Sequence, residues 1–285
     1  MENIIKKIIK EALLEDTFPY GDITSQSLIN KKHLSSFELV ANQNAVLSGI
    51  EVFKQVFFTI DKNIEVKTRY KDGSYISKNT VVTRISGCTM SILKGERTAL
   101  NFISHLSGIS TLTKKLVKKI SGTGVILLDT RKTTPNLRLL EREAVLSGGG
   151  KNHRFNLSDM VLIKDNHIAV SGGIRKAVLR IKKSLWEDKH SLKKKKKIKI
   201  EVEVNNIKEL KDAISMKPDV IMFDNWNVRK LKNAVKLVPS SILTEASGLI
   251  SPSNIQSYAK TGVNYISTGY MVKNAKWVDF SLNVV

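Results

Sequence analysis

The chain has 285 residues, 41% of them hydrophobic and 26% charged, a composition typical of a globular protein with one large domain or two. Its single cysteine excludes an internal disulfide, and no apolar run approaches the roughly 18–20 residues of a membrane span. The formal net charge of +21 is compatible with a solvated lysine-rich surface, with anionic substrates or with nucleic acid. No nucleic-acid-binding module is recognisable, so we expect no nucleic-acid partner. Because no apolar run is long enough to span a membrane, we also expect a cytoplasmic protein with no membrane partner.

The first hundred residues predict a small α+β domain. Apolar residues at helical spacing predict an amphipathic helix over residues 1–14, and the cluster Asp22–Ser25 predicts a helix cap or turn. Strand-like runs follow at residues 36–41, 45–48, 64–70 and 81–86, with a turn over residues 70–74. From Lys94 to Ile120 the pattern is helical, and we expect a break near Gly108.

After Gly124 short apolar strands alternate with amphipathic helices. The predicted strands are residues 125–129, 160–163, 198–204, 220–223, 242–245 and 265–268. The predicted helices are residues 137–147, 174–184, 207–216, 228–238 and 251–260, and the lysine run 193–197 is interpreted as a solvated loop. This alternation predicts parallel strands with crossover helices, arranged as a barrel or near-barrel.

Polar residues stand where these strands end. They are Thr130–Lys132, Lys164–His167, Glu201 and Glu203, Asp224–Asn225, Glu245–Gly248 and Ser267–Gly269. Active sites of parallel α/β barrels lie at the carboxyl ends of the strands, so these residues predict a site there.

Four basic side chains are expected in this site, and together they favour a multiply anionic ligand. They are Arg131, Lys132, Arg154 and Lys164, with His153 beside them. Glu203 and Asp224 are candidates for Mg²⁺ or for sugar hydroxyls. The turns Ser247–Gly248 and Thr268–Gly269 are candidates for holding a phosphate through main-chain N–H groups.

Long motifs in this region resemble the quinolinate phosphoribosyltransferase family. They are Asp-Thr-Arg-Lys-Thr-Thr-Pro at residues 129–135, Gly-Gly-Gly-Lys-Asn-His-Arg at 148–154 and Asp-Met-Val-Leu-Ile-Lys-Asp-Asn-His at 159–167. Shorter matches stand at residues 15–16, 21–25, 95–101, 201–204 and 224–225, so the resemblance runs from about Glu15 to Leu282.

The resemblance implies a fold and an activity. The fold is α/β: an N-terminal α/β sandwich (α+β) domain over residues 1–108, joined by residues 272–285, and an incomplete α/β barrel of the type II phosphoribosyltransferase kind over residues 109–271. The activity joins quinolinate to phosphoribosyl pyrophosphate and releases nicotinate mononucleotide, CO2 and pyrophosphate. The family works as a homodimer or larger homo-oligomer, and Arg97 is expected to reach into the partner's site.

The resemblance also implies residue roles. Lys132, Lys164, Glu203 and Asp224 are expected to be catalytic, with Mg²⁺ held by Glu203 and Asp224. The substrates are expected to contact Arg97, Thr130, Arg131, Lys132, His153, Arg154, Lys164, Glu203, Asp224, Ser247, Gly248, Leu249, Thr268, Gly269 and Tyr270.

Three positions depart from the family pattern. Asn136 and Leu249 stand where the family has glycine, and the segment Tyr270–Asn274 replaces one that often carries a Thr-His pair. Lys273 falls at the place of that histidine and is either a 5′-phosphate ligand or a solvated lysine.

Four other functions stay open. A pyrophosphorylase-like relative associated with molybdate transport and a nicotinate phosphoribosyltransferase lie in the same superfamily. An inactive family member is compatible with the departures, and a basic nucleic-acid-binding protein is compatible with the charge.

Overall fold

The computed structural model describes residues 2–187 and 198–285, so the lysine run 193–197 lies outside the described residues. The chain forms two compact units. The first contains residues up to 115, residues 132–150 and residues 271–285, and the second contains residues 116–131 and 151–270. The domain boundary expected after residue 108 stays a prediction.

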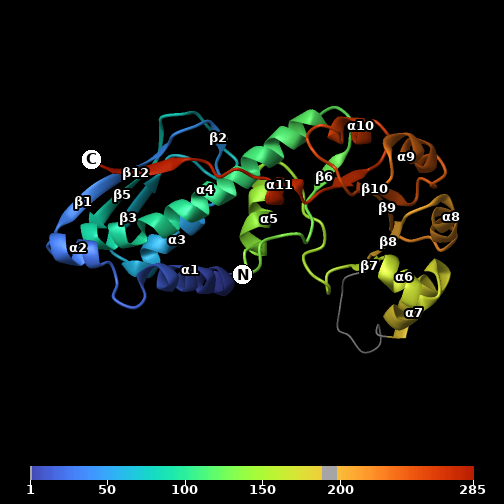
Figure 1. The fold of residues 1–285 in the computed structure, drawn as a ribbon, viewed down its shortest axis with the longest axis horizontal. Coiled ribbons are helices and arrows are strands. Elements are labelled where there is room, and N and C mark those ends of the chain that lie inside the picture. The colour runs from blue at the N-terminus through green and yellow to red at the C-terminus, as the bar shows by residue number, and fades with distance from the viewer. Residues whose placement is uncertain (1, 188–197) are drawn as a thin grey trace. The chain divides into compact units, whose positions relative to one another are not determined.

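The first unit combines an antiparallel sheet with helices (Figure 1). Its strands are β1 (Leu34–Ala41), β2 (Ala45–Val46), β3 (Glu65–Thr68), β4 (Tyr75–Ile76), β5 (Thr80–Cys88) and β12 (Phe280–Val284). Four strands form one sheet in the order β12-β1-β5-β3, and β2 pairs with β4. The sheet therefore takes its edge strand β12 from the end of the chain, where Phe37 pairs with Val284.

Two predictions at the N-terminus are confirmed. Helix α1 (Glu2–Thr17) buries Ile9 and Leu13, as an amphipathic helix should. Helix α2 (Ile23–Leu28) begins after Asp22, whose carboxylate accepts the main-chain N–H of Ser25 at 3.0 Å. A third helix, α3 (Ile50–Ile60), was not predicted from the sequence.

The predicted break near Gly108 is wrong. Helix α4 (Thr89–Lys119) continues through this position without interruption. A Cβ atom at Gly108 would collide with the carbonyl oxygen of Lys276. Glycine is therefore needed here because another segment passes close to the helix, and not because the helix ends.

The second unit contains six parallel strands, and all six predictions are confirmed. They are β6 (Ile126–Leu128), β7 (Val161–Ile163), β8 (Ile200–Val204), β9 (Val220–Asp224), β10 (Leu243–Ser247) and β11 (Tyr265–Ser267). Their order is β6-β11-β10-β9-β8-β7, so the curved sheet has two edges and forms an incomplete α/β barrel.

Helices alternate with these strands and follow the outer side of the sheet (Figure 1). They are α6 (Asp165–Ser171), α7 (Ile174–Glu187), α8 (Ile207–Ser215), α9 (Val228–Val235) and α10 (Ile255–Ala259). A last short helix, α11 (Tyr270–Lys273), comes after β11, and its residues 271–273 belong to the first unit. The predicted helix over residues 137–147 is α5 (Arg138–Ser147), which belongs to the first unit. Among the helices that the structure describes, each is too short or too polar to cross a bilayer.

Candidate active site

Predicted site residues gather at the carboxyl ends of the barrel strands. Lys164 directly follows β7, Glu203 lies near the end of β8, and Asp224 ends β9. Because these strands are neighbours and run in parallel, the three side chains share one edge of the sheet. The Lys164 ammonium lies 2.7 Å from a carboxylate oxygen of Glu203. The lysine side chain is 45% exposed while the glutamate is 6% exposed, so the pair lies at an accessible surface.

Glu203 and Asp224 fit a magnesium site. Both offer carboxylate oxygens from adjacent strands, and Asp224 also accepts a hydrogen bond from the Asn225 side chain at 2.7 Å. Mg²⁺ commonly takes one or two carboxylates and completes its shell with water and substrate phosphates. Glu203 and Asp224 offer two such carboxylates, and a metal ion there would share Glu203 with the Lys164 ammonium at 2.7 Å.

The segment 151–154 lies beside β6, at the open edge of the barrel. Lys151 forms a parallel bridge with Leu128, and the main-chain N–H of His153 donates to the buried carboxylate of Asp129 at 2.7 Å. His153 and Arg154 are thereby held next to the strand that leads to Arg131. Asp129 was not predicted as a site residue.

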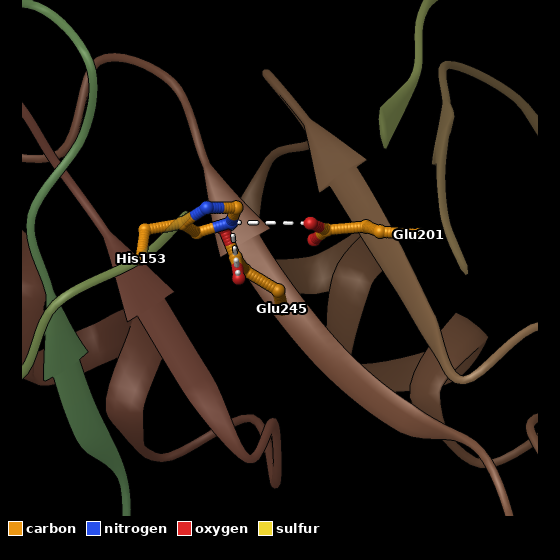
Figure 2. Close-up of side chains that lie close together, drawn as sticks. All are labelled: His153, Glu201 and Glu245. Carbon is orange, nitrogen blue, oxygen red and sulfur yellow. Dashed lines mark ion pairs between the residues drawn. The ribbon is translucent and has the colours of Figure 1, made fainter. Parts of the chain in front are cut away.

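His153 points at two buried carboxylates (Figure 2). Its Nε2 atom lies 3.1 Å from Glu201 and 3.4 Å from Glu245, which come from β8 and β10. Glu201 is 0% exposed and Glu245 is 1% exposed. The other ring nitrogen, Nδ1, accepts the main-chain N–H of Arg154 at 2.7 Å. We call these three side chains the His153 cluster.

The cluster binds protons tightly. Burial and the charge of Glu245 raise the pKa of Glu201 to about 7. Burial disfavours a charged His153, but its contacts with Glu201 and Glu245 outweigh burial and raise the pKa of the ring. The Arg154 amide opposes a second ring proton, because two N–H groups cannot point at each other across 2.7 Å. The two acids thus favour a doubly protonated ring, with a pKa of about 10, whereas the Arg154 contact favours a ring with one proton, on Nε2; the 2.7 Å contact leaves no room for a proton on Nδ1.

Two arginines accompany the cluster. Arg154 is buried and donates to the carbonyl oxygen of Met160 at 3.2 Å. Burial and the charge of Arg131 lower the pKa of Arg154, and Glu201 opposes this shift. Two guanidinium groups that repel each other in a buried region favour an anionic ligand.

A cavity of about 530 Å³ opens beside the His153 cluster. Charged and amide residues of its wall are Lys151, Asn152, His153, Arg154, Asp159, Lys199, Glu201 and Glu245. It also reaches Ile126, Val220 and Tyr265, the first residues of their strands, so it extends toward the amino ends of the barrel.

The turn after β10 has an unusual backbone. A Cβ atom at Gly248 would collide with the Asn225 side chain, so this position requires glycine. Leu249 follows with φ 46° and is 88% exposed, which is a left-handed conformation that leucine rarely adopts. Leu249 therefore adopts a backbone conformation that glycine would adopt without strain. Asn136 likewise has φ 66°.

The turn after β11 is held by Thr268. Its hydroxyl donates to the Ile250 carbonyl at 2.8 Å and accepts the main-chain N–H of Tyr270 at 3.1 Å. Ser247 and Gly269 are half-buried. Phosphate binding by these two turns stays a prediction.

Three other predicted residues lie outside this group. Thr130 follows β6 and is half-buried. Arg97 is exposed on α4, and Lys132 is exposed in the loop before α5, both in the first unit. In that unit the buried carboxylate of Glu141 accepts the main-chain N–H of Thr134 at 2.9 Å and contacts His105 Nε2 at 2.8 Å.

Four buried acids were given no catalytic or binding role from the sequence, although Glu201 and Glu245 were noted among the strand-end residues: Asp129, Glu141, Glu201 and Glu245. Glu201 and Glu245 had a visible signal, since each stands inside an apolar strand of a parallel sheet. An acid in such a strand points to a charged partner across the barrel. Glu141 had no comparable signal, because charged residues are common on amphipathic helices.

Comparison with known proteins identifies the family. The sequence model of the quinolinate phosphoribosyl transferase N-terminal domain matches residues 22–107, and that of the C-terminal domain matches residues 109–283. A probable nicotinate-nucleotide pyrophosphorylase [carboxylating] of Bacillus subtilis is 38% identical over 280 residues, which cover 98% of this chain and 93% of the relative.

Solved structures agree with this assignment. The nicotinate-nucleotide pyrophosphorylase from Francisella tularensis is 39% identical with a TM-score of 0.92, covering 100% of this chain and 97% of that one. The nicotinate-nucleotide pyrophosphorylase from Ehrlichia chaffeensis is 36% identical with a TM-score of 0.90, covering 98% of both chains. The chain belongs to the quinolinate phosphoribosyltransferase family.

Proposed function

We propose that this protein is a quinolinate phosphoribosyltransferase that makes nicotinate mononucleotide for NAD synthesis. Two observations support the proposal: Arg131, Arg154 and His153 lie near the buried Glu201, and Lys164 pairs with Glu203 at the carboxyl ends of the barrel strands. Two substrates with several negative charges would balance the basic groups. The full-length relatives described above bear the name of the same activity.

The proposal assigns each substrate to a set of side chains. Arg131, Arg154 and Lys164, with Lys132, bind the quinolinate carboxylates and the donor phosphates, because guanidinium groups bind carboxylates in a bidentate manner. Glu203 and Asp224 hold ribose hydroxyls and Mg²⁺. The turns at Ser247–Leu249 and Thr268–Tyr270 hold the 5′-phosphate.

The reaction needs no protein nucleophile. The pyridine nitrogen bonds to C1 of the ribose while the C1–oxygen bond breaks and pyrophosphate leaves with the electron pair. Positive charge develops at C1 and lies near Glu203 and Asp224, which stabilise it. The pyridinium then loses CO2 from the neighbouring carbon, and that carbon takes a proton from solvent. Mg²⁺, when bound, supplies charge for the leaving pyrophosphate.

A homodimer or larger assembly belongs to the proposal. Arg97 is exposed on α4, which leaves its guanidinium available to a neighbouring subunit's site. A cytoplasmic location fits an enzyme whose substrates are soluble metabolites.

A direct assay tests the function. Purified protein is incubated with quinolinate, phosphoribosyl pyrophosphate and Mg²⁺, with nicotinate as the parallel substrate, and nicotinate mononucleotide is measured. Product from quinolinate alone is the expected result. Product from nicotinate alone would identify a nicotinate phosphoribosyltransferase. No product from either would favour the molybdate-linked relative or an inactive family member, and salt-sensitive binding of duplex DNA without turnover would favour a nucleic-acid-binding protein.

A pair of variants tests the residue roles. Lys164→Ala should lower kcat/KM for quinolinate by a factor on the order of 100 to 1,000, because an electrostatic contact in the site is lost. Lys208→Ala removes an exposed lysine on α8 and serves as the matched control. Near-normal turnover by Lys164→Ala would contradict the assigned roles.

A further inference from the structure

The inference concerns Glu201 and Glu245, and it rests on the proposed function. Both side chains are almost completely buried, and they come from strands β8 and β10 on either side of β9. Glu201 precedes the catalytic candidate Glu203 by two residues, so both project from the same face of β8. The His153 cluster therefore forms a layer directly beneath the predicted site.

Buried carboxylates are costly unless hydrogen-bond donors or positive charge surround them. The described charged groups near this pair are His153 and Arg154, with Lys151, Lys199 and the acid Asp159 on the wall of the same cavity. His153 is the donor that contacts both acids. Within the described residues, no hydrogen bond reaches either carboxylate oxygen of Glu201 or Oε1 of Glu245, so the pair depends on its ion-pair contacts with His153.

The contacts fix the ring of His153 in one orientation. Nε2 faces the two acids at 3.1 Å and 3.4 Å, while Nδ1 accepts the Arg154 amide at 2.7 Å. Since Nδ1 accepts, Nε2 carries the proton. This tautomer also argues against a metal, although donor atoms of the three residues lie within 4.8 Å of one another. A metal would need the lone pair of Nε2, which holds the proton instead.

We infer that Glu201 and Glu245 are positioning residues for Arg154. They hold the ring proton on Nε2, which leaves Nδ1 to accept the Arg154 amide and so fixes where the guanidinium stands in the cavity wall. The second anchor of Arg154, its bond to the Met160 carbonyl, completes the orientation. The acids themselves do not touch quinolinate.

The first test measures the ring directly. In protein labelled with ¹⁵N-histidine, the His153 signals are those, among five histidines, that vanish in His153→Gln. The expected spectrum near neutral pH shows a neutral ring protonated on Nε2. A ring protonated on Nδ1, or on both nitrogens, would overturn the inference, and so would a shift of these signals on adding Zn²⁺. This readout stands even if the protein fails to make nicotinate mononucleotide.

The second test uses kinetics. Glu245→Gln keeps the size of the side chain but removes the acid, and should raise KM for quinolinate about tenfold, on the scale of one positioning hydrogen bond. Both kcat and KM for phosphoribosyl pyrophosphate should stay within about twofold of wild type. A fall in kcat with unchanged KM would mean that the acid acts in the chemical step, and would overturn the inference.

Two substitutions of His153 separate its nitrogens. Asparagine places a side-chain oxygen near the position of Nδ1, whereas glutamine places its terminal group near that of Nε2. His153→Asn should therefore bind quinolinate more tightly than His153→Gln, as measured by calorimetry. The reverse order would show that the Arg154 amide contact is unimportant. Unchanged circular dichroism in each variant is required before the affinities are compared.

Discussion

Each of the two units contains a half-buried histidine in contact with buried acid, and the two arrangements differ. In the first unit Glu141 contacts His105 and also accepts the Thr134 amide, so each carboxylate oxygen has a donor. In the second unit two acids share the single Nε2 of His153. Burial raises the pKa of a carboxylate, but hydrogen bonds from His105 and Thr134 outweigh it and lower the pKa of Glu141. For Glu201 burial and the second acid prevail, and the pKa rises to about 7.

The contrast teaches that the number of donors per carboxylate decides the direction of the shift. A carboxylate with two donors stabilises the fold as a charged group. Glu201, which shares its only donor with a second acid, instead favours its protonated form. The first arrangement suits a structural anchor for the loop after Lys132, and the second suits a group that orients a neighbouring residue.

The largest expected effect comes from removing the anchor. Glu141→Ala should lower the free energy of unfolding by about 3 kcal/mol near pH 7, because His105 and the Thr134 amide lose their buried partner. Urea denaturation measures it, with Glu143→Ala, an exposed acid of the same helix, as the control.

The stabilisation by Glu141 should depend on pH, in a direction set by its lowered pKa. The folded-state pKa of Glu141 lies below the ordinary 4.5, so its stabilisation is present above that value and is lost as pH falls through the folded pKa. The difference between wild type and Glu141→Ala should therefore shrink in acid. A difference that grows in acid would contradict the account.

The opposite sign is expected in the His153 cluster. The pKa of Glu201 is raised to about 7, so its favourable contribution is present below 4.5 and is lost as pH rises through about 7. Glu201→Gln imitates the protonated acid and should be more stable than wild type near pH 8 by about 2 kcal/mol. Thermal unfolding near pH 5 and pH 8 measures the stability difference between Glu201→Gln and wild type. A variant less stable than wild type near pH 8 would contradict the proposed effect of the second acid on Glu201.

The smallest expected effect concerns two residues with positive φ, Leu249 and Asn136. Leu249 is strained at φ 46°, and its exposed side chain contributes little packing, so Leu249→Gly should raise stability by about 1 kcal/mol. Asn136 has φ 66°, but asparagine tolerates this conformation, so Asn136→Gly should change stability by less than about 0.5 kcal/mol. Calorimetry measures the melting temperature of each variant. An equal rise for Leu249→Gly and Asn136→Gly would contradict the expected difference between the two positions.

The sequence predicted the barrel well because a parallel sheet has a strong pattern. Apolar strands, crossover helices and polar residues at strand ends repeat through residues 125–268, and the six strands are confirmed. Helix α3 was missed because its sequence, Ile-Glu-Val-Phe-Lys-Gln-Val-Phe-Phe-Thr-Ile, is rich in residues that favour strands. Phe53 and Phe57 lie on the buried face of this helix, so tertiary packing outweighs the local preference for a strand.

Long-range contacts explain the other misses. Gly108 was taken for a helix break because the approach of Lys276, far along the chain, has no local signal. The His153 cluster joins residues from three separate segments, so only the fold could bring Glu201 and Glu245 to one nitrogen. Lys164 and Glu203 were each anticipated as site residues because both stand at strand ends, but their pairing was not predicted.

The bridge between Leu128 and Lys151 has a consequence for the design of new specificities. It ties the segment that ends in Arg131 to the segment that carries His153 and Arg154, and the bond from His153 to Asp129 adds a second tie. An insertion or deletion on the amino side of Lys151 would have to be absorbed before this bridge, or every basic residue beyond it would change register. Libraries that seek a different acid substrate should therefore vary the two segments jointly and leave their lengths untouched.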